Sequence, residues 1–180
     1  INIFIQKFGL SATPDSMQYM DAALSFQKFE VNLLPVWGFF YPLLLSIFSL
    51  FLLPAEAACF LNGFAFALLI TSTVRLAYFL RVPWFGLCLV GLIPILWTDI
   101  WHVYQAIWSE SSFIALFSLH FVYLYKYLHH PKTSTWYFVV ITAALALLTR
   151  YIGYFLIPHV LLVLWFYRKK INLNAHLSAL

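Results

Sequence analysis

The sequence is a succession of apolar runs of helical length, separated by short stretches that hold most of its polar residues. Hydrophobic residues make up 64% of the 180 positions and charged residues only 9%, whereas soluble domains carry about 25% charged residues. A helix needs about 20 apolar residues to cross a bilayer, and several runs approach that length. We therefore predict an all-α, polytopic transmembrane helical bundle. The runs occupy residues 31–53, 57–80, 83–101, 111–128, 136–149 and 152–167.

The polar stretches divide the chain into three regions. Residues 1–54 are predicted to form an outer-loop region with amphipathic helices at the membrane surface, and residues 55–170 a transmembrane bundle of about five spans. Residues 171–180 form a polar tail. Because the chain starts at Ile1 and has no signal-peptide pattern, we expect it to be part of a longer protein.

Residues 11–42 are the least apolar part of the chain and hold half of its six acidic residues. Thr13 can cap a helix whose first turn is Pro14-Asp15, because proline lacks the N–H that a first turn leaves unpaired. Apolar residues then recur at helical spacing, which predicts a short amphipathic helix at a membrane surface. These recurring residues are Met17, Met20 and Leu24.

Basic residues predict which side of the membrane each loop faces. The positive-inside rule places Arg168, Lys169 and Lys170 in the cytoplasm. Counting the predicted spans backwards, Arg81 and the loop at 129–135 are then cytoplasmic as well. The positions that fall outside are Glu56, Asp99, Glu110 and Arg150.

The run at 31–53 decides whether the acidic stretch before it lies with these outer residues. If the run crosses the membrane, Asp15 is separated from Glu110. If it lies along the outer surface or re-enters, Asp15 and Glu30 share one compartment with Glu110 and Arg150. The length of the run favours a span, and the chemistry of the acidic residues favours the surface. Its prolines and glycine weaken a straight helix but are compatible with both arrangements.

Three charged residues are the strongest candidates for chemistry, and each has a simpler alternative. Asp15 could only complement the helix dipole, which is worth about 0.3–1 kcal/mol. Glu110 is an acidic group near hydrocarbon, which favours a function, or it faces water in an interfacial loop. Arg150 interrupts about 30 apolar residues, so it needs a carboxylate or an anionic ligand such as phosphate unless it snorkels to an interface. The sequence alone leaves these alternatives open.

Several function classes lack support in the sequence. No Gly-rich phosphate loop, CxxC pair, HExxH or GxSxG motif occurs, so nucleotide binding and hydrolase chemistry are not indicated. The net charge of +4 does not imply nucleic acid as a partner, because the basic residues lie mostly at helix ends. No residue set predicts a metal site.

Four pieces of sequence resemble motifs of one family in their order and spacing: Pro14-Asp15-Ser16 with Tyr19, Tyr41-Pro42-Leu-Leu-Leu45, Ser109-Glu110, and Leu147-Leu-Thr-Arg150-Tyr-Ile-Gly153. The family is that of the membrane-embedded C-type glycosyltransferases, which take a sugar from a polyprenyl-phosphate carrier and include the dolichyl-phosphate-mannose–protein mannosyltransferases. The resemblance covers about residues 12–165, which would be the amino-terminal part of such an enzyme.

The resemblance implies an inverting sugar transferase in the cell (inner) membrane with its active face outward. Asp15 would be the general base, and the substrate-binding residues would be Glu110, Arg150, Tyr151, Tyr19 and Glu30. The implied partners are a polyprenyl-phosphate-linked sugar, a lipid, glycan or protein acceptor, and membrane lipid. Members often carry a second acidic residue where this chain has Ser16, so a divalent metal ion is left open as the one cofactor.

Two other functions are compatible with the same sequence. A multi-pass transporter or channel subunit would use buried ionisable residues along a pathway, and Arg150 and Asp99 fit that role loosely. No internal repeat is visible, although many transporters have one. A membrane scaffold protein is the third possibility, for which the polar outer residues would have no catalytic role.

Overall fold

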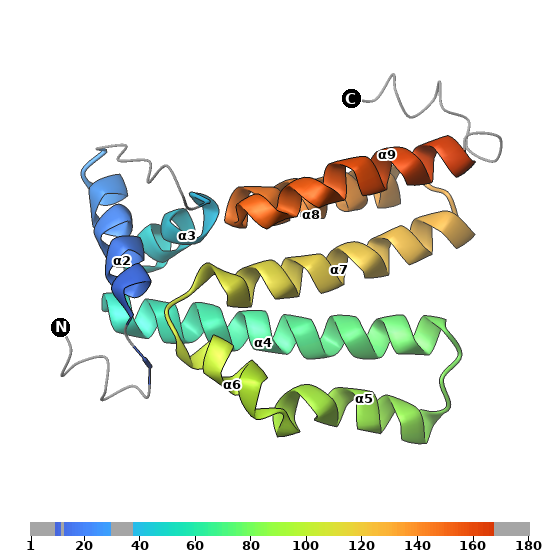
Figure 1. Ribbon diagram of the computed structural model, residues 1–180, viewed down its shortest axis with the longest axis horizontal. Coiled ribbons are helices and arrows are strands. Elements are labelled where there is room, and N and C mark those ends of the chain that lie inside the picture. The colour runs from blue at the N-terminus through green and yellow to red at the C-terminus, as the bar shows by residue number, and fades with distance from the viewer. Residues whose placement is uncertain (1–9, 12, 30–37, 168–180) are drawn as a thin grey trace.

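The computed structural model describes residues 10, 11, 13–29 and 38–167, and its regular structure in these ranges is helical (Figure 1). The all-α prediction is therefore confirmed for the described residues. The helices are α2 (Pro14–Gln27), α3 (Phe40–Phe48), α4 (Pro54–Phe79), α5 (Trp84–Leu96), α6 (Thr98–Gln105), α7 (Ser109–His129), α8 (Thr133–Thr149), the 3-10 turn η1 (Tyr151–Phe155) and α9 (Leu156–Tyr167).

Successive long helices reverse direction, so α4 and α7 run parallel to each other and antiparallel to α5 and α8, and two short helices close one end of the bundle (Figure 1). Helix α7 lies in the middle and packs against both α4 and α8. Helix α5 covers the far side of α4, and α9 returns along α8. Helices α2 and α3 pack on each other across the end at which α4 and α7 begin and α8 ends. This end is called the capped end below.

Helix α2 begins where the sequence predicts. Thr13 has an extended backbone, its hydroxyl accepts from the Ser16 N–H at 3.3 Å, and its own N–H donates to the Ser16 hydroxyl at 3.1 Å. Pro14 follows in the first turn. The cap satisfies N–H groups that the start of a helix leaves without a partner. Local chemistry alone therefore fixes the start of α2 and the position of Asp15.

Helix α3 is too short to cross a bilayer. Its nine residues rise roughly 14 Å, about half of the hydrocarbon thickness. Gly38, just before it, lies against the carbonyl groups of Leu148 and Thr149 at the end of α8. The described part of the run at 31–53 thus lies across the capped end, and Asp15 is on the same end of the bundle as Glu110 and Arg150.

The run predicted at 83–101 is two helices rather than one straight span. Helices α5 and α6 meet at Trp97 with a bend of 57°. Pro94 lies inside α5 and removes one backbone donor, which favours a break in this region. The indole N–H of Trp101 donates to the Ile95 carbonyl at 2.6 Å and so satisfies one acceptor near the end of α5. The segment after Trp97 is therefore a separate short helix, α6.

The expected number of membrane spans is met in part. Among the described residues, α4 is long and apolar enough to cross a bilayer, and α5 with α6 forms a second candidate if the bent pair counts as one span. Helix α8 and the segment Tyr151–Val163 are apolar but shorter than a span.

The core beneath the capped end joins the short helices to the bundle. Tyr19 and Ala23 of α2, and Tyr41 and Leu45 of α3, are buried against the first turns of α4. Ile107, in the segment before α7, is fully buried in the same cluster. Burying such side chains stabilises each by about 1.5–3 kcal/mol, so apolar packing holds α2 in place next to the start of α7.

Candidate functional site

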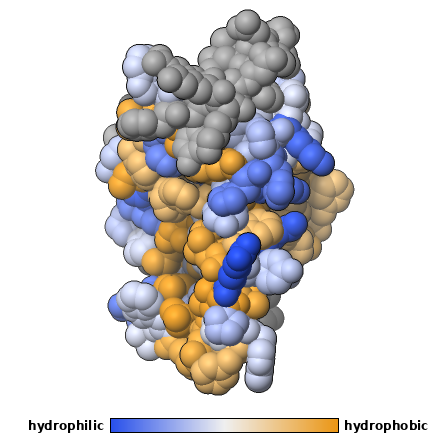
Figure 2. All heavy atoms as spheres, turned by 90° about the vertical axis from the view of Figure 1, so that its right-hand side faces the viewer, coloured by the Kyte–Doolittle hydropathy of each residue, from blue (hydrophilic) through white to orange (hydrophobic). Residues whose placement is uncertain are grey.

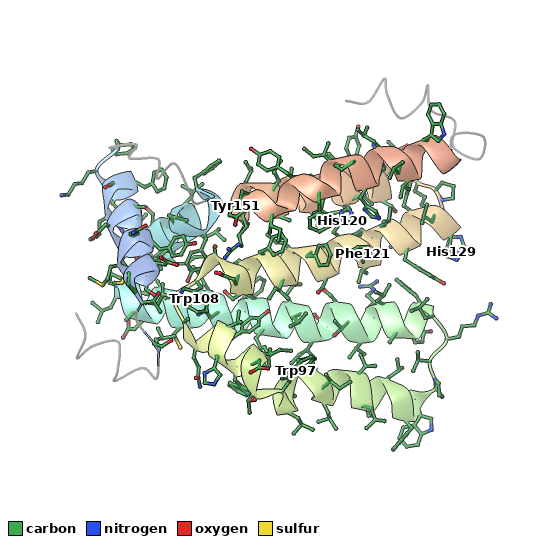
Figure 3. The ribbon with its side chains drawn as sticks, in the orientation of Figure 1. Trp97, Trp108, His120, Phe121, His129 and Tyr151 are labelled. Carbon is green, nitrogen blue, oxygen red and sulfur yellow. The ribbon has the colours of Figure 1, made fainter. Side chains whose placement is uncertain are left out.

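The capped end brings together the three charged residues singled out in the sequence. Asp15 is in the first turn of α2, Glu110 is in the first turn of α7, and Arg150 follows the last residue of α8. Tyr151 and Trp108, which neighbour Arg150 and the start of α7, also lie at this end of the bundle (Figure 3). Segments that are far apart in the chain therefore converge on one candidate site.

Glu110 and Arg150 form an ion pair between a carboxylate oxygen and a guanidinium nitrogen. The Arg150 side chain is 16% exposed and that of Glu110 is 32% exposed. A carboxylate in the first turn of α7 is also stabilised by the helix dipole. Arg150 therefore has the carboxylate partner that its apolar surroundings require.

Tyr19 connects α2 to this ion pair. Its ring is buried, and its hydroxyl shares a 2.8 Å hydrogen bond with the Ser109 hydroxyl, the residue before Glu110. Burial raises the pKa of Tyr19, and the charges of Glu110, Arg150 and Asp15 act on it as well. The hydroxyl is therefore neutral at physiological pH and lies within electrostatic range of all three charged residues.

Tyr41 is a site residue that the sequence analysis did not single out. Its ring is fully buried and meets the Tyr19 ring edge-on, with centroids 5.4 Å apart. Its hydroxyl is buried and has no hydrogen-bond partner among the residues that the structure describes. Burial raises its pKa, and the nearby charge of Glu110 raises it further. In the sequence, Tyr41 stood out only as part of the Tyr41-Pro42-Leu-Leu-Leu45 motif. That motif does not indicate which side chain the Tyr41 ring contacts.

The start of α2 is attached directly to the segment before α7. The indole N–H of Trp108 donates to the Thr13 hydroxyl at 2.8 Å, so the capping residue of α2 also accepts a bond from the junction that carries Glu110. Ser16, which stands where the C-type family often has a second acid, is fully buried and its hydroxyl lies 3.0 Å from that of Thr13. Ser16 thus acts in the cap of α2.

Asn62 of α4 forms hydrogen bonds to the end of α6, to the segment between α6 and α7 and to the first turn of α7. Its amide donates to the carbonyls of Tyr104 at 2.9 Å and Ala106 at 2.8 Å, and its oxygen accepts from the Ser111 hydroxyl at 2.8 Å. The side chain is 2% exposed. Sequence reasoning missed Asn62 because its partners lie more than 40 positions along the chain.

Of the remaining predicted residues, one lies at the capped end, one lies at the bend between α5 and α6, and one is not described. Tyr151 follows Arg150 directly and is 58% exposed, so it is accessible at the capped end. Asp99 is exposed at the α5–α6 bend and accepts from the Trp97 indole at 3.0 Å. Glu30 lies outside the described residues. No group of three or more His, Cys, Asp or Glu side chains that could hold a metal ion occurs within the ranges that the structure describes.

An apolar groove of about 450 Å³ runs beneath the bend between α5 and α6. Leu69 and Thr73 of α4 form one wall, and Val90, Ile93 and Pro94 of α5 form another. Residues of α6 and Ile114 of α7 complete it, with Asp99 contributing to the lining. The lining suits a hydrocarbon chain rather than a polar molecule.

Comparisons with protein-family models, with curated proteins and with solved structures found no match to this chain.

Proposed function

We propose that this chain is an inverting glycosyltransferase that moves a sugar from a polyprenyl-phosphate carrier to an acceptor hydroxyl. The observation that carries the proposal is the Glu110–Arg150 ion pair at the capped end, with Tyr19 of α2 bonded to Ser109 beside it and Asp15 in the first turn of the same helix. The capped end thus holds a carboxylate that can act as a base and a cation suited to phosphate. Transfer from a lipid phosphate uses groups of these two kinds.

The membrane setting is supported by the surface of the bundle. Large apolar side chains of α5 and of α9 are exposed, on opposite sides of the bundle, and exposed apolar surface of this extent is typical of a membrane or protein contact. With α4 and the bent α5–α6 pair able to cross, we place the chain in the cell (inner) membrane as a multi-pass protein. The capped end then faces outward, because the opposite end carries the basic loops.

Asp15 is the proposed general base. The acceptor oxygen attacks the anomeric carbon, Asp15 takes the hydroxyl proton, and the bond from carbon to the phosphate oxygen breaks with its electron pair on the phosphate. The configuration at the anomeric carbon inverts, and the products are the glycoside and the free lipid phosphate. Asp15 is half-buried in the first turn of α2, where it remains accessible to an acceptor.

Arg150 is the group proposed to neutralise the leaving phosphate. Guanidinium forms paired hydrogen bonds with phosphate oxygens, and these strengthen as negative charge develops. Glu110 holds Arg150 in position or orients a sugar hydroxyl, and Tyr19 and Tyr151 line the approach. The groove beneath the α5–α6 bend provides an apolar surface for the prenyl tail.

The proposal is tested by comparing two carboxylates of the same helix. Asp15→Asn should abolish sugar transfer from a polyprenyl-phosphate sugar, whereas Asp21→Asn should retain it, because Asp21 is exposed on α2 away from the ion pair. Both variants remove one negative charge from α2, and expression and helical content are compared as folding controls. The longest available form of the protein is the appropriate sample. Unchanged transfer in Asp15→Asn refutes the assigned role of Asp15.

One observation favours the transporter alternative. His120 is fully buried in the middle of α7, its Nδ1 donates to the Val139 carbonyl at 3.1 Å, and the His159 ring of α9 lies 5.9 Å away between centroids. Buried ionisable groups at this depth line ion pathways in many transporters. Proton or ion flux into proteoliposomes that is lost in His120→Ala and kept in Asp15→Asn would support transport instead of transfer.

A further inference from the structure

The described carboxylates are absent from one end of the bundle. Within the described ranges, the carboxylates belong to α2, to the first turns of α4 and α7, and to α6 after the bend. The end opposite the capped end, formed by the last turns of α4 and α7 and the loops that follow them, has basic residues and no described carboxylate (Figure 1). The residues of this basic end are Arg75, Arg81, Lys126, His129, His130 and Lys132.

Every side chain of the basic end is exposed. Arg81 lies in the turn between α4 and α5 and has a positive φ of 61°. Figure 2 faces this end and shows strongly hydrophilic residues gathered among apolar ones. His129 lies at the same end (Figure 3). These charges are therefore available to a partner and are not neutralised by a described acidic side chain.

A column of rings fixes two of these groups on the seam between α4 and α7. The Arg75 guanidinium lies over the Phe79 ring at 5.8 Å, the Phe79 ring stacks on Tyr125 at 5.5 Å, and Tyr125 stacks on His129 at 4.0 Å. The Tyr125 hydroxyl also donates to the Phe79 carbonyl at 2.9 Å. The basic groups are therefore held in a defined arrangement instead of extending on independent side chains.

Exposed apolar side chains border the basic end. Trp84 is 77% exposed, Tyr78 65%, Phe85 61% and Leu80 60%. Such rings prefer the boundary between hydrocarbon and headgroups, where one edge is apolar and the other is wet. A small free anion has no apolar part that could contact these side chains. A partner that carries both an anionic group and hydrocarbon matches both features.

We propose that the basic end binds the headgroups of anionic phospholipids, with the phosphates against the basic residues and the acyl chains against the apolar border. Each Lys or Arg near a membrane surface contributes about fivefold to the affinity for anionic lipid. This surface is at the opposite end from the candidate site, and its occupant does not depend on the transferase proposal.

The test measures lipid binding to the full chain in a mild detergent. Native mass spectrometry would compare phosphatidylglycerol with phosphatidylcholine of the same acyl composition, and phosphatidylglycerol should bind preferentially. Lys132→Gln should weaken phosphatidylglycerol binding by about fivefold, and the double variant Arg81→Gln/Lys132→Gln should weaken it further. Raised salt should reduce the preference, because the charges are exposed.

Lys28→Gln is the matched control, since it removes one exposed positive charge at the capped end. It should leave phosphatidylglycerol binding unchanged. Equal binding of the two lipids, or an equal loss in Lys28→Gln and Lys132→Gln, overturns the proposal. Inorganic phosphate is added in a separate arm. If it displaces the lipid at equal concentration, the surface recognises free phosphate and the lipid assignment is wrong.

Discussion

Glu110 opens helix α7, Arg150 follows the end of helix α8, and the two side chains form an ion pair at the capped end. The pair joins two neighbouring helices of the bundle beneath α2. Neither side chain is more than a third exposed. The pair therefore has a structural role that can be measured separately from any transfer activity.

A double-mutant cycle on this pair should show coupling. Glu110→Gln leaves a largely buried guanidinium without its carboxylate, and we expect it to lower the free energy of unfolding by about 1–2 kcal/mol. Arg150→Met should be similarly costly. The double variant should cost less than the sum of the two single variants, because each removes the same interaction. Chemical unfolding in detergent, followed by circular dichroism, gives the energies, and strict additivity would contradict the pair.

Tyr19 and Tyr41 should respond in opposite ways to loss of the hydroxyl. Tyr19→Phe removes the hydrogen bond to Ser109 and should cost about 1 kcal/mol. Tyr41→Phe removes a buried hydroxyl that has no partner in the described part of the chain, so it should be neutral or stabilising. The two changes delete the same atom from adjacent rings, which makes each the control for the other. An equal loss of stability in both would mean that Tyr41 has an unrecognised partner.

Two glycines make a second matched pair. A Cβ at Gly38 would collide with the backbone of Leu148 and Thr149, so Gly38→Ala must move α3 away from the end of α8. We expect the free energy of unfolding to fall by about 1–3 kcal/mol and the affinity for any ligand of Arg150 to fall with it. A Cβ at Gly63, in the interior of α4, would meet no described atom within 4 Å. Gly63→Ala should therefore raise the free energy of unfolding by up to about 1 kcal/mol. Thermal unfolding of the two variants checks both signs.

Stability should fall at alkaline pH because of the buried tyrosines at the capped end. Burial raises the pKa of Tyr19 and of Tyr41 above the ordinary value of 10.0. Above about pH 10 the unfolded chain loses these protons while the folded chain keeps them, so ionisation favours unfolding. Below pH 10 the contribution is fully present and constant. The free energy of unfolding, measured from pH 7 to 11.5, should decrease less steeply above pH 10 in Tyr41→Phe than in the parent chain.

Features that depend on neighbouring residues were predictable from the sequence, and features that depend on distant ones were not. The cap formed by Thr13 and the helical spacing after Pro14 are local, and α2 begins as expected. The bend at Trp97 was not expected, although Pro94 marks the region. Charge alone predicted that Arg150 needs an anion, but only the packing of α7 on α8 shows that Glu110 supplies one.

The buried partners of the site could not be read from the sequence. Tyr41 meets Tyr19 because α3 lies across the capped end, and the apolar run at 31–53 was equally compatible with a span. Asn62 lies in the apolar run at 57–80, and the sequence gives no sign of where its hydrogen-bond partners are. Such positions depend on which helices become neighbours, and periodicity carries little information about that choice.

The hydrogen bonds of Asn62 also limit how the bundle can accommodate insertions. One extra residue in α4 ahead of Asn62 would leave its amide facing the α6–α7 junction but would rotate the start of the helix by about 100° relative to α2 and α3. One extra residue after Asn62 would leave the capped end intact and rotate only the half that leads to Arg75. Length changes in α4 should therefore disturb the capped end when they lie ahead of Asn62, and the packing of Ala65 and Leu69 against α6 and α7 when they lie after it.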